Sequence, residues 1–142
     1  MFNSKTYQKC MKEVKQMAKA LRYSRQREKI YEYLLRSEEH PSAETIYAAL
    51  KPELSDLSLA TVYRNLKLLE ELGQVRRVMS HQGTERYDAI CDDHAHFLCE
   101  SCGSISDLAG VDLHQLSSFI PLGNYQVNHL SMTLTGRCPR CS

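Results

Sequence analysis

The 142-residue chain contains no apolar run of membrane-spanning length, and no apolar signal segment follows Met1. We therefore expect a cytoplasmic protein with no membrane partner, in a compartment where thiols stay reduced. Internal repeats and low-complexity segments are also absent from the sequence. With 42% hydrophobic and 25% charged residues, the composition indicates an ordinary soluble protein of one or two small domains.

A large excess of charge of either sign is lacking too, because the formal net charge is only +1. The charge is nevertheless unevenly distributed. Residues 1–87 carry 16 Lys and Arg against 11 Asp and Glu, whereas residues 88–142 carry 2 against 6. The basic front part favours a polyanionic partner such as nucleic acid, and the acidic back part favours cations.

Two Cys-x-x-Cys pairs stand in the acidic part of the chain. Cys99 and Cys102 form the first pair, and Cys138 and Cys141 form the second after 35 intervening residues. Four thiolates suit a closed, tetrahedral and therefore structural zinc site. Two disulfides or idle thiols are the alternatives, but a reduced compartment disfavours disulfides. A redox-active pair would need a thioredoxin-like unit, and the sequence shows none.

His94 and His96 lie just before the first cysteine pair, at the start of a short predicted strand whose alternation would point both imidazoles to one face. A zinc ion held by four thiolates has no position left for them, so the histidines indicate a second metal site. Asp92, Asp93 and Asp107 lie nearby and favour a divalent ion that accepts oxygen as well as nitrogen ligands. The alternative is that both histidines are solvated or packed in a core.

The basic part of the chain shows the periodicity of helices. Residues 7–21 place apolar side chains on one face of a helix, and Ser24 predicts the cap of a second helix that ends near Ser37. Lysines on the flank and opposite face of the first helix favour contacts along DNA phosphates, with a solvated helix face as the alternative. These lysines are Lys5, Lys9, Lys12, Lys15 and Lys19.

Two further helices predict a helix-turn-helix. Ser42 caps the first, and Ser58 caps the second, which spans residues 59–72 and stops at Gly73. Ordinary packing of three helices is the alternative. The exposed side of the second helix offers small, hydroxyl, aromatic and basic side chains to DNA: Ala60, Thr61, Tyr63, Arg64 and Lys67.

A predicted β-hairpin supports the helix-turn-helix, because it directly follows the second helix, where a winged-helix domain has its wing. Residues 74–79 predict one strand, and residues 85–87 predict the returning strand. We therefore expect a winged-helix DNA-binding domain over residues 1–87 and a hinge at 88–93.

The remaining residues, 94–142, predict a small α/β domain, so that the whole chain has an α+β fold. Strands are expected at the histidines, at 104–108 and within 125–135, where Leu130, Met132 and Leu134 alternate with polar residues. A short helix is expected around 112–119. About 50 residues bury little apolar surface, so zinc and dimerisation are the expected supports of this domain.

With these elements in place, the chain resembles the ferric uptake regulator family over essentially its full length. The resemblance implies a metal-responsive repressor with an N-terminal winged helix and a C-terminal dimerisation domain, and not an enzyme. A two-fold homodimer of this kind is expected to bind an inverted repeat in double-stranded DNA. The matching segments are HPSAETIY at 40–47, LATVYRNL at 59–66, RYD at 86–88, HAHFLCESCG at 94–103 and CPRC at 138–141.

The resemblance also assigns the metal ligands. It gives the four cysteines to structural zinc, and it places a regulatory ion between two domains. Three nitrogens and two oxygens suit Fe(II) or Mn(II), which leave a coordination position open. One such ion would hold the DNA-binding and dimerisation domains in a single arrangement. Its implied ligands are His40, Asp88, His94, His96 and Asp107.

Asp107 resembles the peroxide-sensing branch of the family, because iron-sensing members usually have Glu at that point. Peroxide would then act through Fe(II)-catalysed oxidation of a ligand histidine, His40 or His94. The alternative is an iron- or zinc-uptake regulator that responds to metal level without histidine oxidation. Cys91 in the hinge and Arg64 in the second helix of the helix-turn-helix keep this alternative open.

A third metal site of some family members is only partly matched. Ala95 stands where a carboxylate ligand is expected, so Asp93 and His129 would hold an ion weakly.

Two functions outside gene regulation are possible for cysteine pairs of this kind. The Pro-Cys-x-x-Cys of zinc nucleobase deaminases is superficially similar to the last cysteine pair, but those enzymes need a His-x-Glu triplet, which this sequence lacks. A metal store or metal chaperone would leave the winged helix without a purpose. Specific DNA binding would decide against both.

Overall fold

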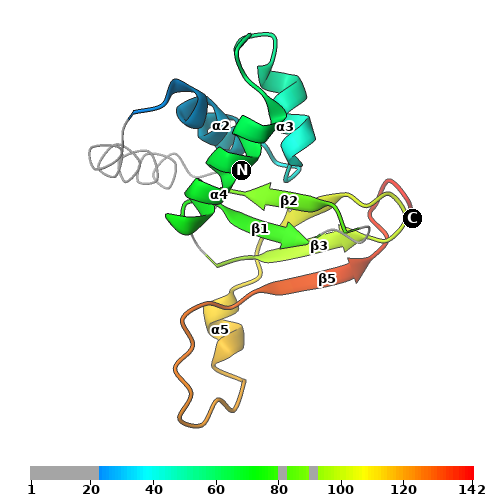
Figure 1. Ribbon diagram of the computed structural model, residues 1–142. Helices are drawn as coiled ribbons and strands as arrows, with labels where there is room; N and C mark the ends of the chain where they lie inside the picture. Colours follow the sequence, from blue (N-terminus) through cyan, green and yellow to red (C-terminus); the bar gives the residue numbers. More distant parts are fainter. Residues whose placement is uncertain (1–22, 80–82, 90–92) are drawn as a thin grey trace. The chain divides into compact units, whose positions relative to one another are not determined.

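The computed structural model describes residues 23–79, 83–89 and 93–142 (Figure 1). The predicted first helix, with Lys9 and Lys12, lies outside the described residues. The chain forms two compact units. The first comprises Met1–Val78 and Glu85–Cys91, and the second comprises Met79–Thr84 and Asp92–Ser142. The hinge at 88–93 and the domain limits stay predictions.

Helix α2, Arg25–Arg36, begins where its cap was predicted. The Ser24 hydroxyl accepts a hydrogen bond from the backbone N–H of Arg27, and Ser37 follows the last turn. One side of the helix is almost fully buried and forms the centre of the core of the first unit. Its buried residues are Ile30, Tyr31, Leu34 and Leu35.

Helices α3, Ala43–Leu50, and α4, Leu59–Glu71, form the predicted helix-turn-helix. Ser42 and Ser58 cap them by accepting from the N–H groups of Thr45 and Thr61. Lys51 holds the connecting loop, because its ammonium donates to the carbonyls of Ser55 and Leu57. The buried side of both helices completes the core with Ala43, Ile46, Leu50, Val62, Leu66 and Leu69.

The end of α4 sets where the hairpin begins. The N–H of Gly73, at φ 68°, donates to Glu70, and the N–H of Gln74 donates to Leu69, which is the Schellman arrangement. Strand β1 is therefore Arg76–Met79, and the predicted start at Gln74 is wrong because that residue still belongs to the helix cap. Strand β2, Glu85–Asp88, pairs with β1 as predicted for a wing.

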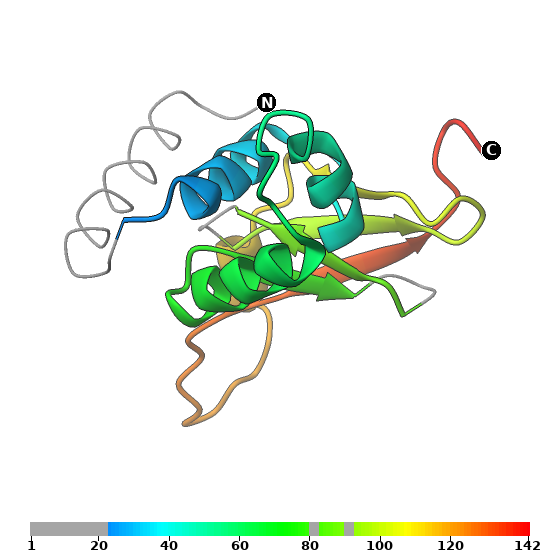
Figure 2. The same ribbon diagram turned by 45° about the horizontal axis from the view of Figure 1, so that its top comes forward.

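The second unit contains a three-stranded sheet in the order β4-β3-β5. The strands are β3, Ala95–Cys99, β4, Ile105–Leu108, and β5, Met132–Gly136. The pairing of β3 is antiparallel with β4 and parallel with β5. Figure 1 and Figure 2 both show β5, in red, beside β3. The short helix predicted around 112–119 is α5, Leu113–Ser117, and Asp112 caps it.

The last strand is shorter than the sequence pattern predicted. Residues 125–131 are not part of it, because β3 begins at Ala95, which already pairs with Met132. The backbone N–H of Leu130 instead donates to the carboxylate of Asp93 at 3.0 Å. Leu134 is 42% exposed, so the apolar side of β5 is only partly covered within one chain.

In the described residues, none of the helices combines the length and the apolar character that crossing a membrane requires.

Candidate metal centres and DNA-binding helix

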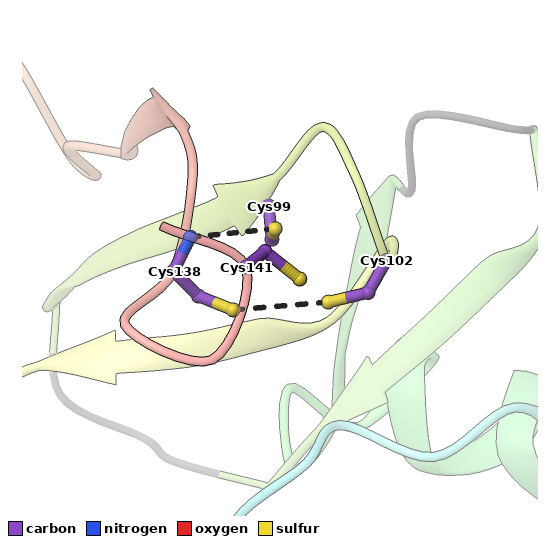
Figure 3. A group of neighbouring side chains, drawn as sticks. All are labelled: Cys99, Cys102, Cys138 and Cys141. Atoms are coloured by element: carbon purple, nitrogen blue, oxygen red, sulfur yellow. Dashed lines mark hydrogen bonds between the residues drawn. The ribbon is translucent and has the colours of Figure 1, made fainter.

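Strand pairing brings the two cysteine pairs together. Cys99 ends β3, and Gly136, its register partner, ends β5, so both parallel strands finish at the same edge of the sheet. Each pair then forms a tight turn. The N–H of Gly103 donates to the carbonyl of Cys99, and the N–H of Cys141 donates to the carbonyl of Cys138. Figure 3 shows the four side chains converging from these two turns.

The spacing of the four sulfurs fits zinc. All four Sγ atoms lie within 4.8 Å of one another, and those of Cys102 and Cys138 are 3.9 Å apart. Four sulfurs at about 2.3 Å from a tetrahedral zinc ion would be separated by about 3.8 Å. A disulfide requires about 2.05 Å, and all four cysteines are free thiols. Cys99 and Cys138 are buried, so the group fits a closed structural site.

The surroundings of the sulfurs favour bound cations. The backbone N–H of Cys138 donates to Cys99 Sγ at 3.4 Å and, with that of Cys102, lowers the pKa of the Cys99 thiol to about 6. Contact with the Cys138 and Cys102 sulfurs raises the pKa of Cys141 to about 12. Several thiolates this close repel one another, and a dication relieves that repulsion.

Three of the predicted regulatory ligands lie together in the second unit. His96 and Asp107 are register partners on the antiparallel strands β3 and β4, so their side chains point to one face of the sheet. Nε2 of His94 lies 3.2 Å from Oδ1 of Asp107, and Nε2 of His96 lies 3.7 Å from the same oxygen. Ligands of one ion at about 2.1 Å are about 3 to 4 Å apart, so these separations fit.

The other two predicted regulatory ligands lie together in the first unit. Asp88 ends β2, and His40 precedes Pro41, whose carbonyl accepts the N–H of Tyr87. This bond holds the loop before α3 against the wing, and it leaves His40 Nε2 3.8 Å from Asp88 Oδ2. Both residues are almost fully buried. An imidazole and a carboxylate at this separation also fit one divalent ion.

The partial third site is open. His129 Nδ1 lies 3.9 Å from Asp93 Oδ1, but the histidine side chain is 77% exposed.

The exposed side of α4 carries the predicted DNA-binding residues. Tyr63, Arg64 and Lys67 are exposed, whereas Thr61 is half-buried and its hydroxyl contacts the capping Ser58 at 2.8 Å. The Tyr63 hydroxyl donates to Oε1 of Glu44 on α3 at 2.6 Å. Helix α4 is therefore positioned by its apolar stripe, with aromatic and basic groups outward.

A model of the "Ferric uptake regulator family" matches residues 18–135. The chain belongs to the ferric uptake regulator family. It is 37% identical over 125 residues to the peroxide operon regulator of Bacillus subtilis, covering 86% of this chain and 85% of the relative.

Solved members of the family agree in fold. The Campylobacter jejuni peroxide stress regulator has a TM-score of 0.73 at 33% identity, covering 94% of this chain and 97% of the relative. A Pseudomonas aeruginosa ferric uptake regulator, solved with manganese, has a TM-score of 0.73 at 26% identity, covering 89% of this chain and 98% of the relative. The predicted fold class, an N-terminal winged helix followed by a small α/β domain with a four-cysteine cluster, is confirmed.

Sequence reasoning missed two residues of this family member's helix-turn-helix. Asn65 is buried on α4, and its amide donates to the carbonyl of Thr61 at 2.9 Å. Glu44, the partner of Tyr63, lies 19 residues away on another helix. The Asn65 bond lies within one turn of α4, but the burial of Asn65 and the Tyr63–Glu44 contact both depend on how α4 packs, so no local pattern signals them.

Proposed function

We propose that this chain is a homodimeric repressor whose binding to an inverted repeat in double-stranded DNA depends on a regulatory metal ion. The observation that carries the proposal is the division of the five candidate regulatory ligands between the two units. His40 and Asp88 belong to the first, and His94, His96 and Asp107 belong to the second. Such a repressor acts in the cytoplasm, where the DNA is and where thiols stay reduced.

The donor sets support two kinds of metal. The four cysteines would hold zinc, which needs no further ligand and serves the structure. The three imidazoles and two carboxylates would hold Fe(II) or Mn(II), which accept both nitrogen and oxygen ligands. The manganese in the Pseudomonas aeruginosa relative supports this choice.

Ligands from two units give the chain a means of switching. An ion that all five residues bind favours the single arrangement of the units in which all five reach it. Moving a population from about 1:99 to 99:1 takes roughly a 10⁴-fold preference for that arrangement. His40 and Asp88 supply this preference, because they are the ligands that the DNA-binding unit contributes.

Peroxide is the signal that we propose, supported by Asp107 and by two relatives that are peroxide regulators. Fe(II) in this ligand set would supply the redox chemistry that cleaves the O–O bond of hydrogen peroxide. One oxygen is then added to the imidazole of His40 or His94, and the second leaves as water. An oxidised imidazole is a poor ligand, so the metal ion no longer holds the two units in the arrangement that binds DNA. The alternative is an iron- or zinc-uptake regulator without histidine oxidation.

In the DNA complex, α4 lies in the major groove with Tyr63 and Arg64 nearest the bases. Thr61 and Lys67 flank them, while Lys9 and Lys12 contact phosphates. Arg discriminates bases when it binds guanine in a bidentate fashion, whereas phosphate contacts set affinity and salt dependence without reading sequence.

A metal titration tests the proposal. The Mn(II)-loaded protein should bind DNA selected from a random library, and chelation should weaken binding by roughly 10²-fold or more while zinc is retained. His40→Asn should abolish the metal dependence, and His114→Asn, an exposed histidine on α5, should preserve it. Fluorescence anisotropy with metal analysis of the same samples measures both. Chelator-independent DNA binding with zinc in place would contradict the proposal.

A further inference from the structure

A hydrogen bond ties the two helices of the helix-turn-helix at the side chains proposed to face DNA. The Tyr63 hydroxyl on α4 donates to Oε1 of Glu44, in the first turn of α3, at 2.6 Å. That distance is typical of a hydroxyl bound to an ionised carboxylate. Tyr63 remains 41% exposed, and its hydrogen bond to Glu44 lies at the surface of the unit.

The protonation of the pair fixes the direction of this bond. The hydroxyl of Tyr63 lowers the pKa of the Glu44 carboxyl, and the backbone N–H of Glu44 and the side chain of Ser42 lower it further. The same bond raises the pKa of the Tyr63 phenol. At neutral pH the carboxylate is therefore ionised and the phenol keeps its proton.

The direction of the bond limits what Tyr63 can recognise. A phenol has one hydrogen to donate, and Glu44 already accepts it, so the Tyr63 oxygen can only accept a further hydrogen bond. The neighbouring carboxylate is also an acceptor, and its charge repels phosphate oxygens. The pair consequently offers DNA only acceptor atoms.

In the major groove, few groups can donate to such an acceptor. The donors are N6 of adenine and N4 of cytosine, whereas N7, guanine O6 and thymine O4 are acceptors. We propose that Glu44 holds the Tyr63 hydroxyl as an acceptor-only group that reads the amino group of adenine or cytosine. The inference rests on the proposed function, which it deepens: Tyr63 reads the base, and Glu44 is a positioning residue.

The next residue on α4 has the opposite character. Arg64 carries only donors, and its guanidinium is 3.5 Å from the hydroxyl of Thr61. An acceptor-only residue beside a donor-only residue discriminates in both directions, because a wrong base leaves either a donor or an acceptor unmatched. A purely structural role for Glu44 and Tyr63, joining α3 to α4, would alter stability and not base preference.

The test compares the base preferences of the Mn(II)-loaded full chain and its variants, by selection from a random library and by titration of the selected sites. The wild type should prefer adenine or cytosine at one position in each half-site. Tyr63→Phe and Glu44→Ala should weaken that preference by roughly 3- to 10-fold. Glu44→Gln should keep it, because the amide oxygen still accepts the hydroxyl hydrogen.

Base analogues and a charge control separate this effect from stability and electrostatics. Replacing the preferred base by purine or 2-pyrimidinone, which lack the amino group, should weaken wild-type binding by the same factor and leave Tyr63→Phe unaffected. Glu53→Ala removes an exposed carboxylate that binds Lys29 and should change affinity for all sequences alike. Thermal unfolding and zinc content verify that each variant is folded.

Two results would overturn this inference and leave the proposed function intact. One is a Tyr63→Phe or Glu44→Ala variant that loses affinity by a common factor on every sequence, or that keeps the wild-type preferences. The other is a preference for guanine or thymine acceptors at the position that Tyr63 governs. A wild type that selects no sequence with Mn(II) would instead overturn the proposed function, and this inference with it.

Discussion

His40, a proposed metal ligand, has an uncommon backbone conformation. Its φ is 47°, and no other non-glycine residue in the described ranges has a positive φ. This left-handed region costs most residues about 1 to 2 kcal/mol, while Asn tolerates it better. Because the side chain is also almost fully buried, substitution of His40 acts on both the proposed ligand set and the backbone.

Two substitutions of His40 should therefore differ in stability. We expect His40→Asn to be more stable to denaturant than His40→Ala by about 1 kcal/mol, because only Asn suits the positive φ. Urea unfolding of the zinc-loaded, chelator-treated protein measures the difference. The same pair of substitutions at the exposed Glu39, whose φ is negative, serves as control. Equal free energies of unfolding for both His40 variants would refute this reading of the backbone.

At the scale of elements, what the sequence predicted was local. The start of a helix was predicted at each of three serines, Ser24, Ser42 and Ser58. Each serine does cap a helix, because its side chain accepts the backbone N–H three residues later. Cysteine spacing likewise predicted the four-sulfur cluster. Each of these signals lies within a few neighbouring residues, so it can be recognised without knowledge of the tertiary structure.

Contacts between elements were not predictable in the same way. The register that sets Asp107 opposite His96 and the end of β5 at Gly136 depend on strand pairing. The apolar alternation over 125–135 overestimated the last strand, because alternation records side-chain character and not the length of the partner strand. The Tyr63–Glu44 contact also needs two packed helices.

An ion-pair network joins α4 to the wing. The guanidinium of Arg77 on β1 donates to Glu70 at 2.7 Å and to Glu85 on β2 at 2.5 Å. The hydroxyl of Tyr87 donates to the other oxygen of Glu85 at 3.0 Å. The network therefore helps to fix the hairpin relative to the helix proposed to read DNA.

The Arg77–Glu85 pair should contribute little to stability, because both side chains are more than a third exposed. We expect a double-mutant cycle of Arg77→Gln and Glu85→Gln to give a coupling energy of about 0.5 kcal/mol, and the coupling to fall in high salt. Urea unfolding of the two single variants and the double variant measures it. Strict additivity would show that the network does not hold the wing.

At the scale of the whole molecule, the second unit has little core of its own. Large apolar side chains remain exposed there, which a monomeric unit of this size rarely tolerates. We expect the proposed homodimer to cover part of these side chains. The zinc site is expected to stabilise the remainder of the second unit. The exposed apolar side chains include Phe119, Ile120, Tyr125, Val127 and Leu134.

Loss of the four-cysteine site should therefore destabilise the proposed homodimer. Cys99→Ser should give a zinc-free and largely monomeric protein, because this buried sulfur ends β3 and contacts the second cysteine pair. Size-exclusion chromatography with light scattering and zinc analysis measure the outcome. Cys10→Ser, the same chemical change outside the cluster, should preserve zinc and dimer. An intact, zinc-free dimer of Cys99→Ser would contradict the role of zinc.

The central claim, a repressor released by oxidation of its own ligand, is tested most directly by peptide mass analysis. The Fe(II)-loaded protein on its DNA is treated with near-stoichiometric peroxide, and tryptic peptides containing His40 and His94 are compared with those of the Mn(II)-loaded protein. We predict a mass gain of one oxygen on one of the two histidines with Fe(II) only, together with release of DNA. Unmodified His40 and His94 peptides with DNA still bound would contradict the account and favour regulation by metal level alone.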